Sequence, residues 1–336
     1  MGYQLDSKHT SIVFCVFPKH LLHMHTCHDN MVELKFWQGV ESNEYWYNRV
    51  NKIGDGGNSV NYRVVRSIEN VDGDLANGAG VSYAVKIFDE TVDSDSSRLD
   101  GFYEERDFLR ETDHPSILSC HDYGVWNGHP FYVSDHMSKS MRNVIRGEEI
   151  SFRKKVEFAV QLLSAVAHLA NSEPPIVHRD IKPSNILIKA DSCVLADFGA
   201  MKFLDDEHSE VEQEREVSES AYPYYYRTPD IIRYERDGTE LTPKSDVFQL
   251  GLVLAELFTG RNPEKPPDTN EEYPSVELEE LRYIHGTNGG QVADLLNQML
   301  SVDPADRPPA SEIIIPWREL LENTTRQELE LNGRVL

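Results

Sequence analysis

Short alternations of apolar and polar residues dominate residues 45–137 and predict β-strands. The clearest are Ser82–Phe88 (SYAVKIF) and Pro130–Met137 (PFYVSDHM), which are rich in β-branched and aromatic residues. One helical pattern interrupts the strands, because the large apolar residues of GFYEERDFLRE (101–111) recur at the spacing of one helix face. We therefore expect a small β-rich lobe that contains a single important helix.

The period changes after Ser138, where apolar residues recur every three or four positions. Lys154–Ala170 carries an apolar stripe on one helical face, and Ser245–Gly260 is apolar nearly all round. A helix that is apolar on every side is buried, and Gly260 is well placed to end this one. The whole pattern predicts an α+β fold with two lobes, a small, mostly β N-terminal lobe and a larger, mostly α C-terminal lobe.

These patterns divide the chain into four parts. Residues 1–44 form an N-terminal extension that we expect to be flexible, since terminal segments are commonly disordered unless they are tied down. Residues 45–137 form the first lobe, 138–325 the second, and 326–336 a polar tail. Histidines and a cysteine crowd together in the extension, but their spacing matches no closed tetrahedral metal site.

Composition and charge narrow the function classes. Of the 336 residues, 39% are apolar and no run of eighteen is apolar, so we expect a globular protein that does not enter a membrane. The formal net charge of −24 argues against nucleic acid as a partner and permits a protein substrate with basic segments. The four cysteines are scattered without a CxxC pair, which fits a reducing cytoplasmic location.

The first candidate for chemistry is the glycine-rich stretch Ile53–Tyr62 (IGDGGNSVNY). Gly54, Gly56 and Gly57 would let backbone N–H groups approach phosphates more closely than residues with side chains could. The signal is weak by itself, because glycine-rich hairpin turns are common.

Lys86 stands inside the alternating strand YAVKIF, where an ammonium group is costly to bury without a partner. An ion pair with Glu105, on the helix that follows, would satisfy both groups and aim the ammonium at a phosphate. The alternative is an edge-strand lysine whose stem lies along apolar surface while its charge reaches water.

The densest cluster of chemical groups is IVHRDIKPSNIL, residues 176–187. Asp180 could accept a hydroxyl proton, Lys182 could neutralise a phosphoryl group in transfer, and Asn185 could bind a metal. Asp197 of ADFGA supplies a second carboxylate seventeen residues after the first. Mg²⁺ takes few protein oxygens and adds phosphate oxygens, so Asn185 and Asp197 together suit it. Any one of these residues could occur by chance, but their order and spacing together argue for a site.

Taken together, these motifs resemble the eukaryotic-type protein kinase family over about residues 45–321, with HRDIKPSN followed by DFG as the most specific part. The resemblance implies a bilobal kinase fold that uses ATP and Mg²⁺ to phosphorylate protein substrates. It assigns Asp180 as the catalytic base, Lys182 to the γ-phosphate, and Asn185 and Asp197 to the metal ions. By the same resemblance, Lys86 binds the α/β-phosphates and pairs with Glu105.

The resemblance also implies a nucleotide-binding set from both lobes. Its members are Ile53, Gly54, Gly56, Gly57, Val60, Ala84, Lys86, Asp135, Met137 and Leu187, with backbone groups of Asp135 and Met137 on adenine and with Ala84 and Leu187 on either side of the ring. The family's valine beside adenine falls on Asn61, or on Val60 if the turn is one residue shorter.

Further family features imply contacts in the second lobe. A stacked column of Leu109, Cys120, His178 and Phe198 is expected to rest on Asp246, and Asp230 of TPD is expected to pair with Arg307. Lys182 is the serine/threonine form of its motif, whereas Pro223 resembles tyrosine kinases, so specificity for Ser/Thr is the favoured of two alternatives.

By the same resemblance, Arg179 is the cation that would bind a phosphate group on the acidic segment Leu204–Tyr222. One hypothesis is that Ser209, Ser218, Ser220 or Tyr222 is phosphorylated and binds Arg179. A second is that an acidic residue already mimics the phosphate, and a third is a solvated loop without a regulatory role.

Two other functions remain open. A pseudokinase or scaffold would use the fold for binding alone, and the altered glycine loop favours that alternative. A small-molecule kinase would have a similar architecture, but Arg179 and the segment that ends at Asp230 count against it.

Overall fold

The structure is a computed structural model, and it describes residues 39–42, 45–55, 59–67, 81–89, 96–147, 149–204, 226–265, 275–276, 278 and 286–331. Most of the predicted N-terminal extension, Gly56, Gly57 and almost all of the acidic segment lie outside the described residues. The chain forms two compact units. The first unit comprises the described residues up to Asp89 together with Asp122–Val133, and the second comprises the rest.

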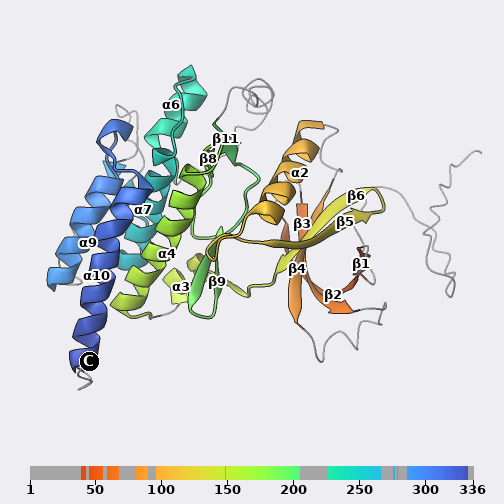
Figure 1. Ribbon diagram of the computed structural model, residues 1–336, viewed down its shortest axis with the longest axis horizontal. Coiled ribbons are helices and arrows are strands. Elements are labelled where there is room, and N and C mark those ends of the chain that lie inside the picture. The colour runs from red at the N-terminus through yellow and green to blue at the C-terminus, as the bar shows by residue number, and fades with distance from the viewer. Residues whose placement is uncertain are drawn as a thin grey trace, which may run out of the picture. The chain divides into compact units, whose positions relative to one another are not determined.

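The first unit is built on a six-stranded sheet in the order β1-β2-β3-β4-β6-β5 (Figure 1). Its strands are β1 (Gly39–Glu41), β2 (Trp46–Asp55), β3 (Ser59–Ser67), β4 (Ser82–Phe88), β5 (Cys120–Trp126) and β6 (His129–Asp135). The pairs from β1 to β4 are antiparallel. Both strands that the alternation predicted most clearly are present, as β4 and β6.

Strand register decides which side chains share a face of this sheet. Val60 and Tyr62 of β3 lie opposite Ile87 and Val85 of β4, and all four belong to the buried apolar core of the unit. Residues directly opposite in an antiparallel pair point to the same face, and side chains alternate along each strand. The residues between them therefore form the other face of the sheet.

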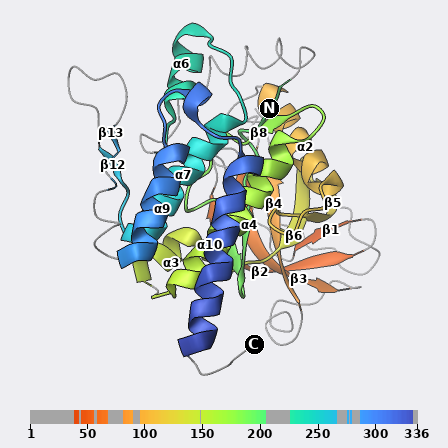
Figure 2. The same cartoon turned by 60° about the vertical axis from the view of Figure 1, so that its left-hand side comes forward.

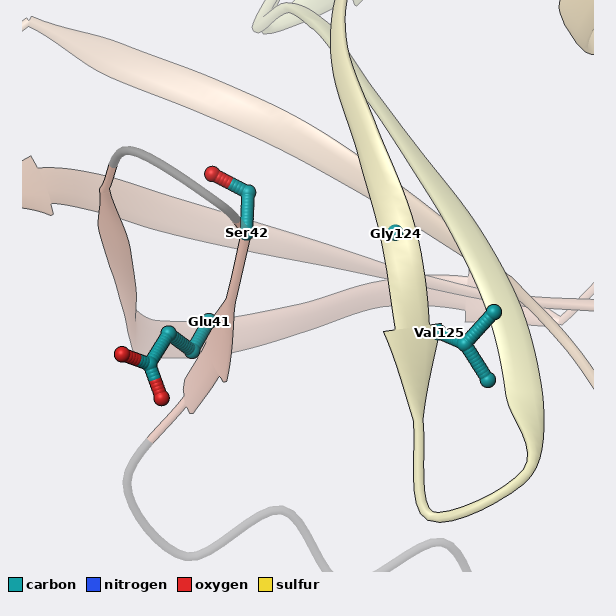
Figure 3. A pocket seen from close by; sticks show the side chains of 4 residues that line it. All are labelled: Glu41, Ser42, Gly124 and Val125. Carbon is teal, nitrogen blue, oxygen red and sulfur yellow. The ribbon is translucent and has the colours of Figure 1, made fainter. Parts of the chain in front are cut away.

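The two edge strands of the sheet, β1 and β5, lie close to each other although they stand at opposite ends of the strand order. A Cβ added at Gly124 of β5 would lie 3.7 Å from the Glu41 carbonyl oxygen of β1, and the hydroxyl of Tyr47, on the neighbouring β2, donates to Asp122 of β5 at 2.7 Å. That Cβ would also lie 2.8 Å from the Phe131 ring, so close packing requires glycine there. A pocket of about 400 Å³ lies at this junction, lined by Glu41, Ser42, Gly124 and Val125 (Figure 3). None of the predicted site residues lines it.

The second unit is mainly helical. Its helices are α2 (Ser96–Glu111), α3 (Met141–Gly147), α4 (Phe152–Ala170), α6 (Pro229–Asp237), α7 (Lys244–Thr259), α9 (Gly286–Met299), η2 (Pro304–Asp306) and α10 (Ala310–Leu331). Its short strands are β7 (Lys139–Ser140), β8 (Ile176–Val177), β9 (Ile186–Lys189), β10 (Ser192–Leu195), β11 (Lys202–Phe203), β12 (Glu264–Lys265) and β13 (Ser275–Val276). Among the described residues, no helix is both long enough and apolar enough to cross a membrane.

Helix α7 is the centre of this unit. Its residues are buried on every side from Ser245 to Ala255, as the apolar pattern predicted. The helix ends at Gly260, which takes the left-handed conformation with φ 80° and donates its N–H to Glu256. Helices α4 and α9 pack against α7, and α10 packs against α4 and α9 (Figure 2). The predicted α+β fold, with a β-rich and a helical part, is confirmed.

Two strand pairs position the candidate site. Strand β8 pairs with β11, and β9 pairs with β10, both antiparallel. The loop 178–185 connects β8 to β9, and the loop 196–201 connects β10 to β11. Each of the two loops that carry the predicted catalytic groups therefore joins one of these strand pairs to the other. Helix α2 and the start of β5 belong to this second unit, and the boundaries expected from the sequence stay predictions.

Candidate active site

Three of the predicted catalytic residues meet in the loop between β8 and β9. The Lys182 ammonium donates to both carboxylate oxygens of Asp180, at 2.9 and 2.7 Å. The Asn185 amide donates to the Asp180 carboxylate at 2.8 Å and to its carbonyl oxygen at 3.0 Å. Asp180 is therefore held from two sides by residues two and five positions further along the chain, and a general base needs such a fixed position.

Asp246 of α7 anchors the start of this loop. Its carboxylate accepts the backbone N–H of His178 at 2.7 Å and of Arg179 at 3.1 Å. Arg179 has a φ of 67°, a conformation that costs free energy for any residue other than glycine and persists only when its surroundings enforce it. Burial raises the pKa of Asp246 to about 7, against the effect of the two hydrogen bonds. The stacked column was expected to rest on Asp246, and this hydrogen bond anchors one of its members, His178.

His178 is a fully buried, neutral residue of the framework. Burial lowers its pKa and outweighs the opposing attraction of the nearby Asp180 and Asp197 carboxylates. One ring nitrogen, Nε2, lies 3.2 Å from the Ala196 carbonyl oxygen, and the other, Nδ1, accepts the Asp180 N–H at 3.3 Å. These partners assign the proton to Nε2, because a carbonyl oxygen can only accept.

The predicted stacked column is present in part. The His178 ring lies 4.5 Å from the Phe198 ring, and the Phe198 ring lies 4.8 Å from that of Phe108 on α2. The sequence assigned the α2 position to Leu109, which is buried. The aromatic contact belongs to the residue before it. Phe108 thus adds a ring to the column, and the place of Leu109 in it, which the family resemblance implied, stays a prediction.

Glu105 and Asp197 come together beside the start of the second loop. The Phe198 N–H donates to Glu105 at 3.1 Å, and Glu105 is 1% exposed. A Cβ at Gly199 would lie 3.7 Å from the Glu105 carboxylate and 3.8 Å from that of Asp197, so both carboxylates lie around this glycine. Asp197 itself is exposed and has a φ of 64°. The turn therefore presents the Asp197 carboxylate to solvent while Glu105 holds the next residue.

The predicted nucleotide residues of the first unit divide between the two faces of the sheet. Lys86 lies opposite Asn61, and Ala84 opposite Arg63, on the face away from the apolar core. Val60 belongs to that core, so the structure does not bring it together with Ala84 and Lys86. Asn61 takes the place beside them, the first of the two alternatives that the sequence left open.

Three further features concern Lys86 and the strand β2. The Lys86 ammonium lies 5.9 Å from the centre of the Tyr132 ring. Ile53 is 48% exposed, and the pairing of β2 with β3 shifts register between Lys52 and Gly54. Shifts of this kind re-aim a strand next to a site. Glu105 belongs to the other unit, so its pair with Lys86 stays a prediction.

The remaining predicted nucleotide residues belong to the second unit. Asp135 ends β6, Met137 follows it, and Leu187 lies on β9 opposite Val194. The Asp135 side chain accepts hydrogen bonds from Lys189 and, at 3.0 Å, from His121. Burial acts to raise the pKa of Asp135, but these hydrogen bonds outweigh it and the pKa is lowered. Because the Asp135 side chain is occupied by these hydrogen bonds, the predicted contact with adenine would be made by the Asp135 backbone.

A buried ion pair joins the first turn of α6 to Arg307, the residue that follows η2. The Arg307 guanidinium donates to both carboxylate oxygens of Asp230, at 2.6 and 3.2 Å. Arg307 also donates to the carbonyl oxygens of Lys244 and Ser301 and lies over the Phe248 ring. The predicted pair is confirmed, and the shorter side chain of aspartate reaches the arginine with both oxygens.

No motif in the sequence pointed to a second buried carboxylate in this region, that of Glu264 on β12. One of its oxygens accepts the Tyr226 N–H at 2.7 Å, and the other is buried and has no hydrogen-bond partner among the residues that the structure describes. The Tyr226 hydroxyl donates to Glu256 of α7. Burial, with a smaller contribution from the Glu256 charge, raises the pKa of Glu264 to about 7.

Glu264→Gln should therefore stabilise the protein at pH 8 and lose that advantage at lower pH. Above pH 7 the folded state carries the cost of a buried charge. As pH falls from about 7 to the ordinary value of 4.5, the folded protein binds a proton that the unfolded chain does not, so wild-type stability rises. At about 1.4 kcal/mol per pKa unit the change is at most about 3 kcal/mol. Denaturant unfolding of both proteins at several pH values measures it, and a pH-independent difference would contradict it.

The oxygen atoms of Asn185 and Asp197 suit a small divalent cation. Amide and carboxylate oxygens are the ligands that Mg²⁺ prefers, and Mg²⁺ completes its shell with water and phosphate oxygens. Within the described ranges there is no group of three or more His, Cys, Asp or Glu side chains that could hold a metal ion. The donors present therefore fit a cation that is shared with a phosphate ligand.

Known proteins resemble the chain in the part that contains these residues. The model of the protein kinase domain family matches residues 47–317. The present chain is 26% identical to cell division control protein 2 homolog 3 of Trypanosoma brucei brucei over 306 residues, which are 81% of this chain and 91% of that relative. It is 26% identical over 262 residues to serine/threonine-protein kinase 12 of Arabidopsis thaliana, covering 74% of this chain and 54% of that one.

A third relative matches a shorter part. The present chain is 31% identical, over 185 residues or 54% of its length, to a protein of Acanthamoeba polyphaga mimivirus named as a serine/threonine-protein kinase/receptor. The match spans only a tenth of that relative. The family model covers most of the present chain, including every predicted site residue. The chain therefore belongs to the protein kinase family.

Proposed function

We propose that the protein transfers the γ-phosphate of ATP to serine or threonine residues of protein substrates. The observation that supports it most is the arrangement of Asp180, with Lys182 and Asn185 both bonded to its carboxylate. A base, a cation and a metal-binding amide in one loop are the groups that phosphoryl transfer requires. The names of the relatives and the presence of Lys182 favour serine and threonine over tyrosine.

In this mechanism, Asp180 accepts the proton of the substrate hydroxyl as its oxygen bonds to the γ-phosphorus. The bond from that phosphorus to the bridging oxygen breaks, and ADP leaves with the electron pair. Lys182 offsets charge on the transferred group. A Mg²⁺ ion held by Asn185 and Asp197 would neutralise phosphate charge. The chain itself contributes mainly position and electrostatic stabilisation.

We assign nucleotide binding to both units. In the first, Lys86 is proposed to bind the α/β-phosphates, and Ala84 and Asn61, on the same face, to contact the nucleoside. In the second, we propose the backbone of Asp135 and Met137 and the side chain of Leu187. The segment from Tyr226 to Asp230 is assigned to the protein substrate.

The alternative is a nucleotide-binding scaffold with little activity. Asn61 favours it, because a polar amide stands beside Ala84 where the family has valine. The presence of Lys86, Glu105, Asp180, Asn185 and Asp197 counts against it, since each of the charged groups required by the mechanism is there.

Labelled ATP decides between these functions. Purified protein is incubated with [γ-³²P]ATP, MgCl₂ and a generic basic protein, and the products are analysed for phosphoamino acids. We expect phosphoserine or phosphothreonine, and we expect Asp197→Ala to lower transfer by about a hundredfold or more, as the loss of an electrostatic group at the transferring phosphate would. Glu322→Ala, at an exposed position of α10, serves as the control.

The other outcomes are equally informative. A rise in melting temperature with Mg-ATP but no transfer would favour the scaffold. Phosphotyrosine alone would overturn the Ser/Thr assignment, and full activity of Asp197→Ala would overturn the metal assignment.

A further inference from the structure

The side chain of Gln249 joins two segments of the second unit that are far apart in sequence. It projects from the buried helix α7 and is 3% exposed. Its amide nitrogen donates to the carbonyl oxygen of Arg179 at 2.8 Å and to that of Tyr226 at 2.9 Å. Its amide oxygen accepts the N–H of Ile181 at 3.0 Å. Both amide hydrogens and the oxygen are therefore engaged with backbone groups.

Two of these backbone groups flank Asp180. Arg179 precedes the proposed base and Ile181 follows it, so Gln249 holds the peptide units on both sides of that residue. Asp246, three residues earlier on α7, holds the N–H of Arg179. The backbone around Asp180 is thus held by one helix, α7. A shift of the Gln249 side chain would move the peptide units on either side of Asp180, because buried hydrogen bonds join them.

The third backbone group belongs to Tyr226, which has a φ of 69° and therefore needs external support. Its N–H is held by Glu264, its carbonyl oxygen by Gln249 and its hydroxyl by Glu256. All three partners lie on α7 or in the first residues after it. Tyr226 is thus clamped to the same helix that supports Asp180.

We infer that Gln249 is a positioning residue that couples the substrate-docking segment at Tyr226 to the backbone of Asp180. The inference rests on the proposed function for the roles of these two segments. Only a primary amide of this length supplies two donors and one acceptor here. Glutamate keeps the acceptor for Ile181 and loses both donors, and leucine keeps the approximate volume and loses all three bonds.

The test compares Gln249→Glu and Gln249→Leu with Gln161→Leu. Gln161 of α4 is a matched control, because its amide oxygen accepts the Cys193 N–H at 2.8 Å, away from the proposed base. We expect both Gln249 variants to lose about ten- to hundredfold in kcat/KM for a peptide, the range for a small misplacement of a catalytic group. The KM for ATP should stay within about twofold, since nucleotide contacts are not touched. Gln161→Leu should leave both constants unchanged.

Amide hydrogen exchange gives a readout that does not depend on activity. In Gln249→Leu, exchange should accelerate both at Ile181 and at Tyr226–Arg227, while in Gln161→Leu it should accelerate only near Cys193. Acceleration in one of the two segments alone, or an unchanged peptide kcat/KM, would overturn the coupling. If the wild type transfers no phosphate, the proposed function fails, and the exchange pattern still decides whether the two segments are coupled. Gln249→Met, which also lacks the amide and loses all three bonds, serves for the exchange measurement if the leucine variant does not fold.

Discussion

Asp180→Asn should lower phosphate transfer at saturating ATP and substrate by at least about a hundredfold, the contribution typical of a positioned general base. An amide has nearly the shape of a carboxylate but cannot accept the hydroxyl proton. The Asn185 amide still donates to the Asp180 carbonyl oxygen and Asp246 still accepts the His178 N–H, because neither hydrogen bond depends on the Asp180 charge. We therefore expect the fold to persist, with initial rates and thermal unfolding as the two measurements.

The matched control is Asp191→Asn, the same chemical change at a side chain that is 94% exposed. It removes a surface contact with Lys154, which contributes little. Asp180→Asn that turned over at the wild-type rate would contradict the assignment of the base. A large loss in both variants would point instead to a general effect of charge.

Arg307→Met should lower the free energy of unfolding by about 3–5 kcal/mol, because it leaves the buried Asp230 carboxylate without its cation. The Arg307 side chain is 0% exposed and that of Asp230 is 6% exposed, so water does not reach the orphaned charge. The carbonyl oxygens of Lys244 and Ser301 lose their donor as well. Denaturant unfolding measures the change.

A double variant separates the cost of the orphaned charge from the loss of packing. Arg307→Met with Asp230→Leu should recover part of the lost stability, since replacing both members of a buried pair by apolar residues costs less than removing one. The exposed pair of Arg236 with Asp237 is the comparison, and Arg236→Met should change stability by less than about 1 kcal/mol. Equal effects of Arg307→Met and Arg236→Met would show that burial does not control the strength of these pairs.

Local patterns in the sequence predicted that three polar groups of the loop 178–185 act together. Asp180, Lys182 and Asn185 lie within six residues of one another, so the chain has little freedom to separate them, and the structure joins all three by hydrogen bonds. The buried helix α7 and its end at Gly260 followed from periodicity and from the conformational freedom of glycine. These features depend on neighbours in sequence, which a pattern records directly.

The choice between Val60 and Asn61 needed the paired strands. A shift of one residue moves every side chain of a strand to the opposite face, and the length of the preceding turn did not determine that shift. The register of β3 with β4 places Val60 in the core and Asn61 opposite Lys86. On α2, the ring contact of Phe108 with Phe198 likewise depends on tertiary packing that no local pattern contains.

By itself, then, the sequence determined the kinase fold, the grouping of Asp180, Lys182 and Asn185 in one loop, and the helices that support that loop. The tertiary structure alone decided how the clamp at Tyr226 is built from Gln249, Glu256 and Glu264. Those residues carry no motif, and Gln249 reaches partners up to 70 positions away in sequence. Such contacts depend on how a central helix packs among segments that are distant in the chain, and no local pattern contains that information.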